Sequence, residues 1–171
     1  MISMILLCGM SYSQTSISAF GSKIVFVKPD SSVWHLIQDS RPSEGSKGVT
    51  MFKHAPIKDS LGRPVEPVIA LVYENIPDTI DVIEYSVGVL GSKPYSIRRD
   101  LLGGYPEYSS DKHSVVFKGD YSRSGVKHKV MLGYIFFKHI GIELIGDATD
   151  GVYDKVESDI QKFIKSVAIK N

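Results

Sequence analysis

The chain has 171 residues, of which 43% are hydrophobic and 23% charged, and its formal net charge at pH 7 is +1. This composition excludes a disordered polyelectrolyte. The near-zero net charge argues against a nucleic-acid partner, because phosphates are bound by an excess of lysine and arginine. A chain of this length can bury one sizeable hydrophobic core. We therefore expect one folded domain and no nucleic acid among its partners.

The first element in chain order is an apolar run over residues 2–10. It is too short for a membrane-spanning helix but has the length of the hydrophobic region of a signal peptide. Small serines follow at alternate positions, which suits a peptidase that cuts between Ser13 and Gln14. An ordinary buried N-terminal strand is the alternative. We predict a signal peptide over residues 1–13, a periplasmic or secreted protein, and no stable membrane insertion after cleavage.

The single cysteine, Cys8, lies inside this run. Lipid modification requires a small residue just before the cysteine, but Leu7 occupies that position. After cleavage the mature chain, residues 14–171, has no thiol for a disulfide, a thiolate metal site or a nucleophile. We expect a single domain over residues 14–171 that is stabilised by its core and holds no cofactor.

The N-terminal half of the mature chain predicts strands and one anchoring tryptophan. Segments rich in β-branched and aromatic residues predict strands over residues 22–28, 48–55 and 66–76. Trp34 is the only tryptophan, and Ser31 or Ser32 would cap a short helical turn beginning there. An indole can bury about 200 Å², so we expect Trp34 to dock against the core. An exposed indole that stacks on a ligand is the alternative.

Two segments predict helices, over residues 78–91 and 150–168. In the first, Asp78 suits the N-cap and Gly91 the C-terminus. Its expected buried stripe consists of Ile80, Ile83, Val87 and Leu90. The second is amphipathic and rich in lysine in its last turns, as the helix dipole favours. Its expected buried face consists of Val152, Val156, Ile160, Phe163 and Val167.

The segments between the two helices predict further strands. They cover residues 93–104, 113–125 and 127–148, and the last is long enough for a hairpin that turns near residues 138–141. The tight turns favour antiparallel neighbours, since parallel strands need long crossovers. We therefore predict an α+β fold, an α-β-α sandwich with an antiparallel sheet of five or more strands flanked by helices.

The order of these elements resembles a known family. A tryptophan after "FVKPDSSVW", a mid-chain helix, a four-stranded meander and the ending "VYDKVESDIQKFIKSV" resemble the PsbP-like fold over residues 22–168. That fold is found in photosystem oxygen-evolving accessory proteins and in small exported bacterial proteins. The resemblance implies a non-catalytic exported accessory or binding protein of the cell envelope.

No catalytic or metal-binding motif is present among the five histidines, which are His35, His54, His113, His128 and His139. His128 and His139 would form a metal site if they met across a hairpin and His54 joined them, but surface histidines are the simpler interpretation. We predict no metal. Asp147 and Asp150 flank the start of the second helix, where capping explains them. A small envelope hydrolase with a His/carboxylate site remains the alternative to a binding protein.

Basic and aromatic residues alternate between residues 93 and 129. Such a mixture can bind anionic ligands or a partner protein, although two ordinary strands with a charged outer face would give the same pattern. We predict an unknown protein or a small anionic ligand as the partner. The predicted ligand-binding residues are Tyr95, Arg98, Arg99, Tyr105 and Tyr108.

Overall fold

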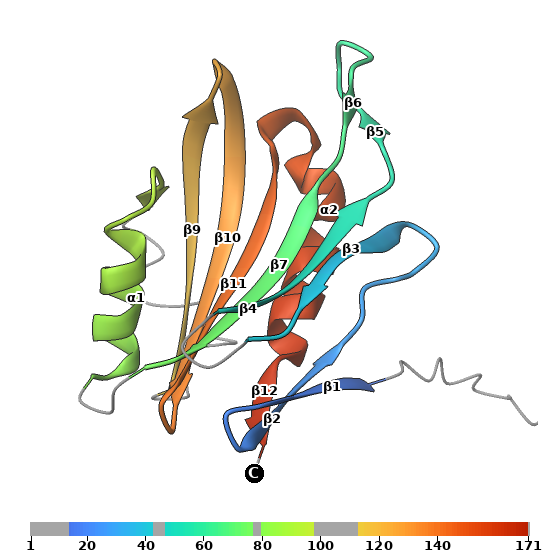
Figure 1. Cartoon of the computed structure of the whole chain (residues 1–171). Helices are drawn as coiled ribbons and strands as arrows, with labels where there is room; N and C mark the ends of the chain where they lie inside the picture. Colours follow the sequence, from blue (N-terminus) through green and yellow to red (C-terminus); the bar gives the residue numbers. More distant parts are fainter. Residues whose placement is uncertain (1–13, 43–46, 77–79, 98–112, 171) are drawn as a thin grey trace, which may run out of the picture.

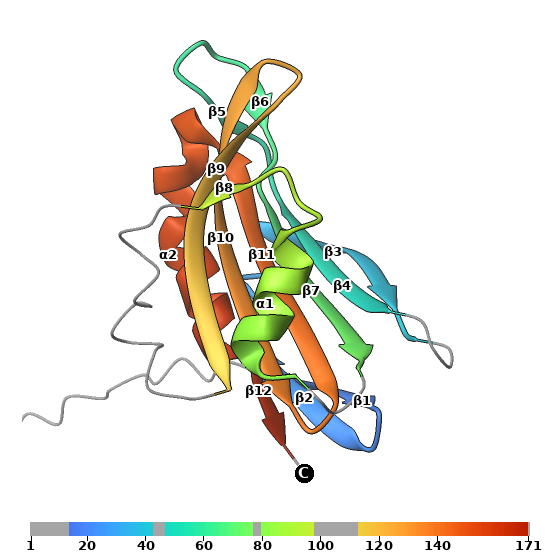
Figure 2. The same ribbon diagram turned by 90° about the vertical axis from the view of Figure 1, so that its left-hand side faces the viewer.

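The computed structural model describes residues 14–42, 47–76, 80–97 and 113–170. Its centre is a seven-stranded sheet in which every pairing is antiparallel, with one helix on each face (Figures 1 and 2). The predicted α+β class is confirmed. In spatial order the strands are β3 Trp34–Ser40, β4 Gly48–His54, β7 Val68–Asn75, β11 Ile140–Thr149, β10 Val126–Phe137, β9 Ser114–Arg123 and β8 Ser96–Ile97.

Five strands that are short or exposed were predicted from the sequence only in part or not at all. Two of them, β1 Gln14–Ala19 and β12 Ala168–Lys170, pair on either side of β2 Ser22–Val27 in a small three-stranded sheet. Another hairpin, formed by β5 Ile57–Lys58 and β6 Pro64–Val65, projects from one end of the molecule (Figure 1). The edge strand β3 is exposed after its first residue. Four of these strands, β3, β5, β6 and β12, lack an alternating apolar pattern because neighbouring strands, rather than burial, stabilise them. The fifth, β1, does alternate and buries Ile17 and Ala19.

The two helices lie on opposite faces of the sheet. Helix α2, Asp150–Ser166, shares one core cluster with β1, β2 and the facing side of the large sheet, and its predicted buried face is confirmed. Helix α1, Val82–Leu90, packs on the other face against β9 and β10. Successive residues of β11 face opposite sides of the sheet. A side chain at Gly146 would collide with Ile160 of α2 on one side, and a side chain at Gly141 would collide with Tyr85 of α1 on the other.

The N-terminus and the buried side of α1 differ from the prediction. Asp81 is the N-cap, and its carboxylate accepts hydrogen bonds from the N–H groups of Ile83 and Glu84 at 2.8 and 2.9 Å. Asp78, the predicted cap, lies outside the described residues. The predicted stripe is wrong at Ile83 and Val87, which are 54% and 61% exposed, whereas Ile80 and Leu90 pack against the core as predicted.

Tyr85 determines which side of α1 faces the sheet. Its ring is buried against Tyr134 and Phe136, with ring centroids 6.0 and 5.9 Å apart. An aromatic side chain of this size gains more from burial than an isoleucine or valine at the flank of so short a helix. The helix therefore turns Tyr85 toward the sheet and leaves Ile83 and Val87 in solvent.

Trp34 is in the core, as predicted, and begins strand β3. A single turn precedes it, in which the carbonyl of Asp30 accepts from the N–H groups of Val33 and Trp34 at 3.1 and 2.8 Å. The turn before it is held by Asp30, whose carboxylate accepts from the N–H of Ser32 at 2.9 Å. The indole N–H donates to Asp159 of α2 at 3.3 Å, and the indole meets the ring of His54 edge-on at 4.8 Å. The indole thus joins β3, β4 and α2.

The β10–β11 hairpin turns at Lys138 and His139, close to the predicted position, with φ of 47° and 68°. Neither residue favours this left-handed conformation, which costs roughly 1–2 kcal/mol per L-residue. Replacing Lys138–His139 by Asn-Gly should therefore raise the free energy of unfolding by about 1–2 kcal/mol. Urea unfolding measures this gain, and the control pair Lys138→Gln with His139→Gln keeps the strain and should give none. An equal gain in the control would contradict this explanation.

Candidate functional site

Three polar side chains meet where β9, β10 and β11 lie side by side. They are Tyr121, His128 and Asp147, and we call them the Tyr121–His128–Asp147 cluster. The Asp147 carboxylate accepts a short hydrogen bond from the Tyr121 hydroxyl and one of 2.9 Å from Nδ1 of His128. The tyrosine and histidine rings pair across the strands, with centroids 4.9 Å apart. All three side chains are partly buried, on the face of the sheet that α1 also covers.

Two tyrosines in this region are held in their neutral form. Burial raises the pKa of Tyr121 far above its ordinary value, and the hydrogen bond to Asp147 and that carboxylate's charge add to the effect. Tyr95 lies edge-on to Tyr121 with ring centroids 5.2 Å apart. Burial, followed by the charges of Glu143 and Asp147, raises the pKa of Tyr95 to about 12. Both phenols therefore remain protonated at neutral pH.

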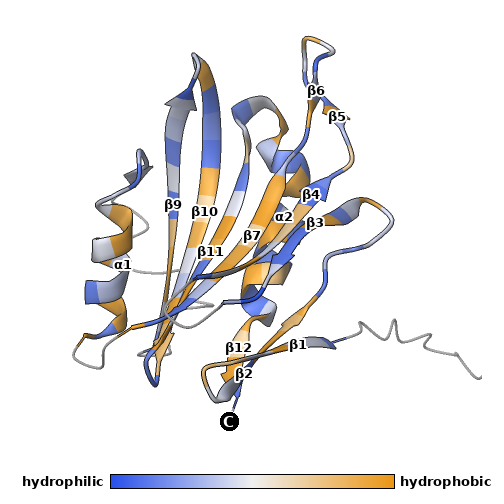
Figure 3. Cartoon of the chain, viewed as in Figure 1, coloured by the Kyte–Doolittle hydropathy of each residue, from blue (hydrophilic) through white to orange (hydrophobic). Residues whose placement is uncertain are grey.

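The cluster opens onto two adjoining hollows of about 360 and 380 Å³. Both are lined by Pro94, Tyr121 and Ser122, and we call them together the β8–β10 cleft. Figure 3 shows this end of β9 and β10 as hydrophilic, in contrast to the middle of the sheet. The volume suits a small organic molecule. The further lining residues are Tyr95, Ser96, Asp120, Arg123, Lys127, His128, Lys129 and Asp150.

Among the described residues, one of the basic side chains around the β8–β10 cleft is neutralised by carboxylates and two are not. Lys129 is shared between Asp150 at 3.0 Å and Asp154 at 3.2 Å. In contrast, Arg123 and Lys127 are exposed and have no carboxylate partner within the described part of the chain. The carboxylate of Asp147 is already occupied by its two donors. The cleft therefore presents cations, neutral phenols and the carboxylate of Asp120 to a ligand.

A second buried carboxylate supports the wall of the cleft. Glu143 is 4% exposed and accepts from the Tyr134 hydroxyl and from Nζ of Lys93, both at 3.3 Å. Lys93 immediately precedes Pro94 and Tyr95. The Glu143–Lys93 pair therefore anchors this segment to β11 and positions Tyr95 beside the cleft.

Of the predicted ligand-binding residues, Tyr95 lies in the wall of the β8–β10 cleft. The other four, Arg98, Arg99, Tyr105 and Tyr108, lie outside the described residues. The sequence analysis missed Tyr121, His128, Arg123 and Lys127 as site residues. The hairpin pattern of β9 and β10 was the one signal that could have found them, because it places residues 121 and 128 opposite each other.

The capping role predicted for Asp147 is wrong. Helix α2 has Thr149 as its N-cap, without a side-chain capping bond, and Asp147 points to Tyr121 and His128 instead. Asp150 lies in the first turn of the helix and pairs with Lys129. Asp147 belongs to β11, where side chains alternate between faces, and this turns it away from the helix.

The histidine metal site that the sequence left open does not form. His128 pairs opposite Thr149 at one end of the β10–β11 hairpin, and His139 lies in the turn at the other end. His54 packs against Trp34 in β4. No group of three or more histidine, cysteine, aspartate or glutamate side chains suited to a metal ion occurs among residues 14–42, 47–76, 80–97 and 113–170.

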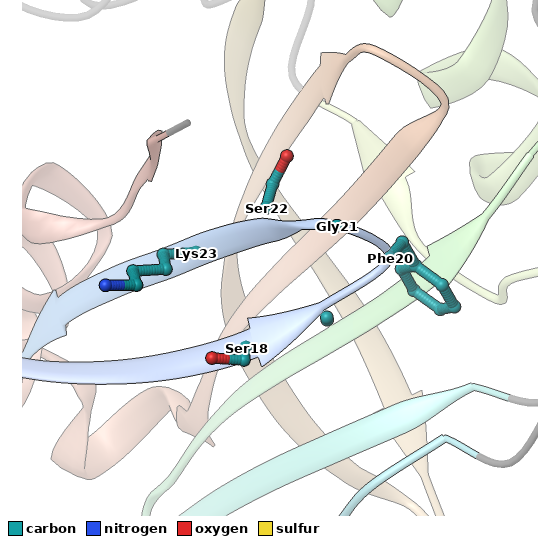
Figure 4. Close-up of a pocket in the computed structure, with 6 residues that line it drawn as sticks. Ser18, Phe20, Gly21, Ser22 and Lys23 are labelled. Atoms are coloured by element: carbon teal, nitrogen blue, oxygen red, sulfur yellow. The ribbon is translucent and has the colours of Figure 1, made fainter.

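A separate hollow of about 360 Å³ lies at the turn between β1 and β2 and is lined by residues 18–23 alone (Figure 4). Figure 4 shows the side chains of Phe20 and Ser22 pointing away from each other. Six consecutive residues of one turn do not bring convergent groups to a ligand. This hollow is a surface feature of the hairpin.

The chain matches no family model and no curated protein sequence. Its fold is similar to a crystal structure of LpqN, described as involved in cell envelope biogenesis of Mycobacterium tuberculosis. The match has a TM-score of 0.57 and 18% sequence identity, and it covers 93% of this chain and 91% of the other. At this identity the likeness shows a shared fold. Among the described residues, no helix has the length and apolar character needed to cross a membrane.

Proposed function

We propose that this chain is an exported, non-catalytic binding or accessory protein of the cell envelope. The proposal includes a signal peptide over residues 1–13, a periplasmic or secreted mature protein and one domain over residues 14–171 of PsbP-like type. The fold shared with LpqN, a protein described as involved in envelope biogenesis, supports an envelope role. The apolar run before Ser13 supports export.

The ligand we propose is a small anionic molecule with an apolar or aromatic body, bound in the β8–β10 cleft. The observation that carries this proposal is that two cations without carboxylate partners among the described residues line adjoining hollows, Arg123 beside the neutral ring of Tyr95 in one and Lys127 beside His128 in the other. The guanidinium and ammonium groups would bind the anion, and the ring would contact the body of the ligand. Arg98, Arg99, Tyr105 and Tyr108 follow Tyr95 in the chain and are proposed to complete the site.

Titration with benzoate, followed by nuclear magnetic resonance, tests this function. Benzoate should shift the resonances of Tyr95, Tyr121 and His128, whereas uncharged benzamide should shift them far less. The double change Arg123→Gln and Lys127→Gln should weaken benzoate binding by about tenfold or more, since charge-assisted contacts contribute roughly 1.5–3 kcal/mol each. The matched control Lys162→Gln, on an exposed position of α2, should leave it unchanged. Equal shifts with benzamide, or shifts outside the cleft only, would contradict the proposal.

One contact favours the alternative of a hydrolase. The 2.9 Å bond from His128 to Asp147 fixes the imidazole as a carboxylate fixes a general base. If the protein hydrolyses simple esters and His128→Gln abolishes this hydrolysis, the cleft is an active site. Binding of benzoate without such hydrolysis supports the non-catalytic function.

A further inference from the structure

The β5–β6 hairpin carries the most exposed large hydrophobic side chain of the described residues. Leu61, at its tip, is 73% exposed. Both views show this hairpin projecting from the same end of the molecule as the turn between β9 and β10 (Figures 1 and 2). A leucine held this far from the core contributes nothing to the stability of the isolated domain.

The tip that presents Leu61 is rigidly built. The carboxylate of Asp59 accepts from the N–H groups of Leu61 and Arg63, both at 2.9 Å, and from Nε of Arg63 at 2.8 Å. The side chain of Asp59 is 6% exposed, and the backbone N–H of Arg63 is the main cause that holds its pKa below the ordinary value. Gly62 supplies the left-handed conformation of the turn at φ 77°. The exposure of Leu61 is therefore imposed by an ordered turn.

The surroundings of the tip carry several ion pairs and two further cations. Asp59 is neutralised by Arg63 at 2.8 Å, and Lys53 and Glu66 form a close pair at the base of the hairpin. Lys58 and Lys155 are exposed and have no carboxylate partner among the described residues.

Lys155 also fixes the hairpin to the start of α2. Its Nζ donates to the carbonyl of Lys58 at 3.1 Å. Arg123 and Lys127, which flank the β9–β10 turn, add two further cations without carboxylate partners in the described part of the chain at the same end of the molecule. An apolar tip with cations beside it is complementary to a bilayer surface with anionic headgroups, where each basic residue contributes about 1 kcal/mol. The carboxylates nearest to it on α2, Asp150 and Asp154, share Lys129.

We propose that the β5–β6 hairpin docks the protein on an anionic lipid bilayer. Leu61 enters the boundary between headgroups and acyl chains, and Lys58 and Lys155 lie against the lipid phosphates. A single leucine and a few lysines give weak, reversible binding, which suits a protein that samples the membrane surface rather than one that inserts into it. The docking shares Arg123 and Lys127 with the ligand proposed for the β8–β10 cleft, whereas Leu61, Lys58 and Lys155 lie outside that cleft and separate the two proposals.

Co-sedimentation with vesicles tests the docking. The purified protein should bind phosphatidylcholine vesicles that contain phosphatidylglycerol, bind pure phosphatidylcholine far less, and dissociate as salt is raised. Leu61→Ser should weaken the binding by about tenfold and Lys58→Gln by about fivefold. Leu61→Trp adds a direct readout, because the emission of the new indole should shift to the blue only with the anionic vesicles.

Matched variants elsewhere on the surface serve as controls. Leu36→Ser, at an exposed leucine on the edge strand β3, and Lys162→Gln, on α2, should leave vesicle binding unchanged. Equal binding to neutral vesicles, or equal losses in the controls, would overturn the proposal. No binding by a folded protein would also overturn it and would assign the tip to contact with another protein.

Discussion

Trp34→Ala should lower the free energy of unfolding by about 3–5 kcal/mol, as expected when a fully buried large aromatic side chain is truncated. The indole is 2% exposed, and it joins β3 to α2 through Asp159 and to β4 through His54. The substitution removes apolar contacts from the core and leaves a cavity that the surrounding strands can only partly fill. Urea unfolding followed by circular dichroism measures the loss, because the variant has no tryptophan to report by fluorescence.

Two measurements separate packing from the hydrogen bond of the indole. Asp159→Asn keeps the indole, weakens its polar partner and removes the exposed pair with Lys162, so it should cost about 1 kcal/mol or less. The emission of Trp34 in the native protein should be blue-shifted and weakly quenched by iodide. A loss below about 1 kcal/mol in Trp34→Ala, with water-like emission in the parent protein, would refute its place in the core.

Gly146→Ala should lower the free energy of unfolding by about 1–3 kcal/mol, the usual cost of overpacking a core. A Cβ at this position would lie 2.1 Å from Cγ2 and 3.0 Å from Cβ of Ile160, so α2 would have to move off the sheet. The loss appears in the midpoint of urea unfolding. Gly88→Ala is the matched control, because no atom lies within 4 Å of its added Cβ and alanine favours a helix.

A double-mutant cycle identifies the steric cause. If Ile160 is the obstacle, Gly146→Ala combined with Ile160→Ala should lose less stability than the sum of the two single changes. Gly88→Ala should be neutral or stabilising by up to about 1 kcal/mol. An additive double change would show that the cost of Gly146→Ala arises elsewhere, in the strand backbone itself.

Local pattern predicted some elements well and one helix face badly. The 17-residue α2 has apolar residues at helical spacing over its whole length, so its buried face could be predicted from sequence. The 9-residue α1 has apolar side chains on several sides, so no single stripe dominates. There the packing of Tyr85 against Tyr134 and Phe136 decides which side is buried, and those residues lie far away in the chain.

The candidate site could be predicted only in part. Tyr95 and a basic, aromatic stretch were visible in the sequence, but the Tyr121–His128–Asp147 cluster depends on the pairing of three strands. Asp147 and Tyr121 are 26 residues apart, and a shift of one residue in either pairing would turn a side chain to the opposite face. Nothing local to Asp147 distinguishes it from a helix cap.

The sequence by itself therefore determined the α+β class, the position of α2, the hairpin of β10 and β11 and the burial of Trp34, because each follows from hydrophobic periodicity or from the size of one side chain. Only the tertiary structure decided the phase of α1, the role of Asp147, the exposure of Leu61 and the lack of carboxylate partners for Arg123 and Lys127 among the described residues. The physical reason is that burial and charge pairing depend on neighbours from distant segments, whose positions are set by strand register and sheet order.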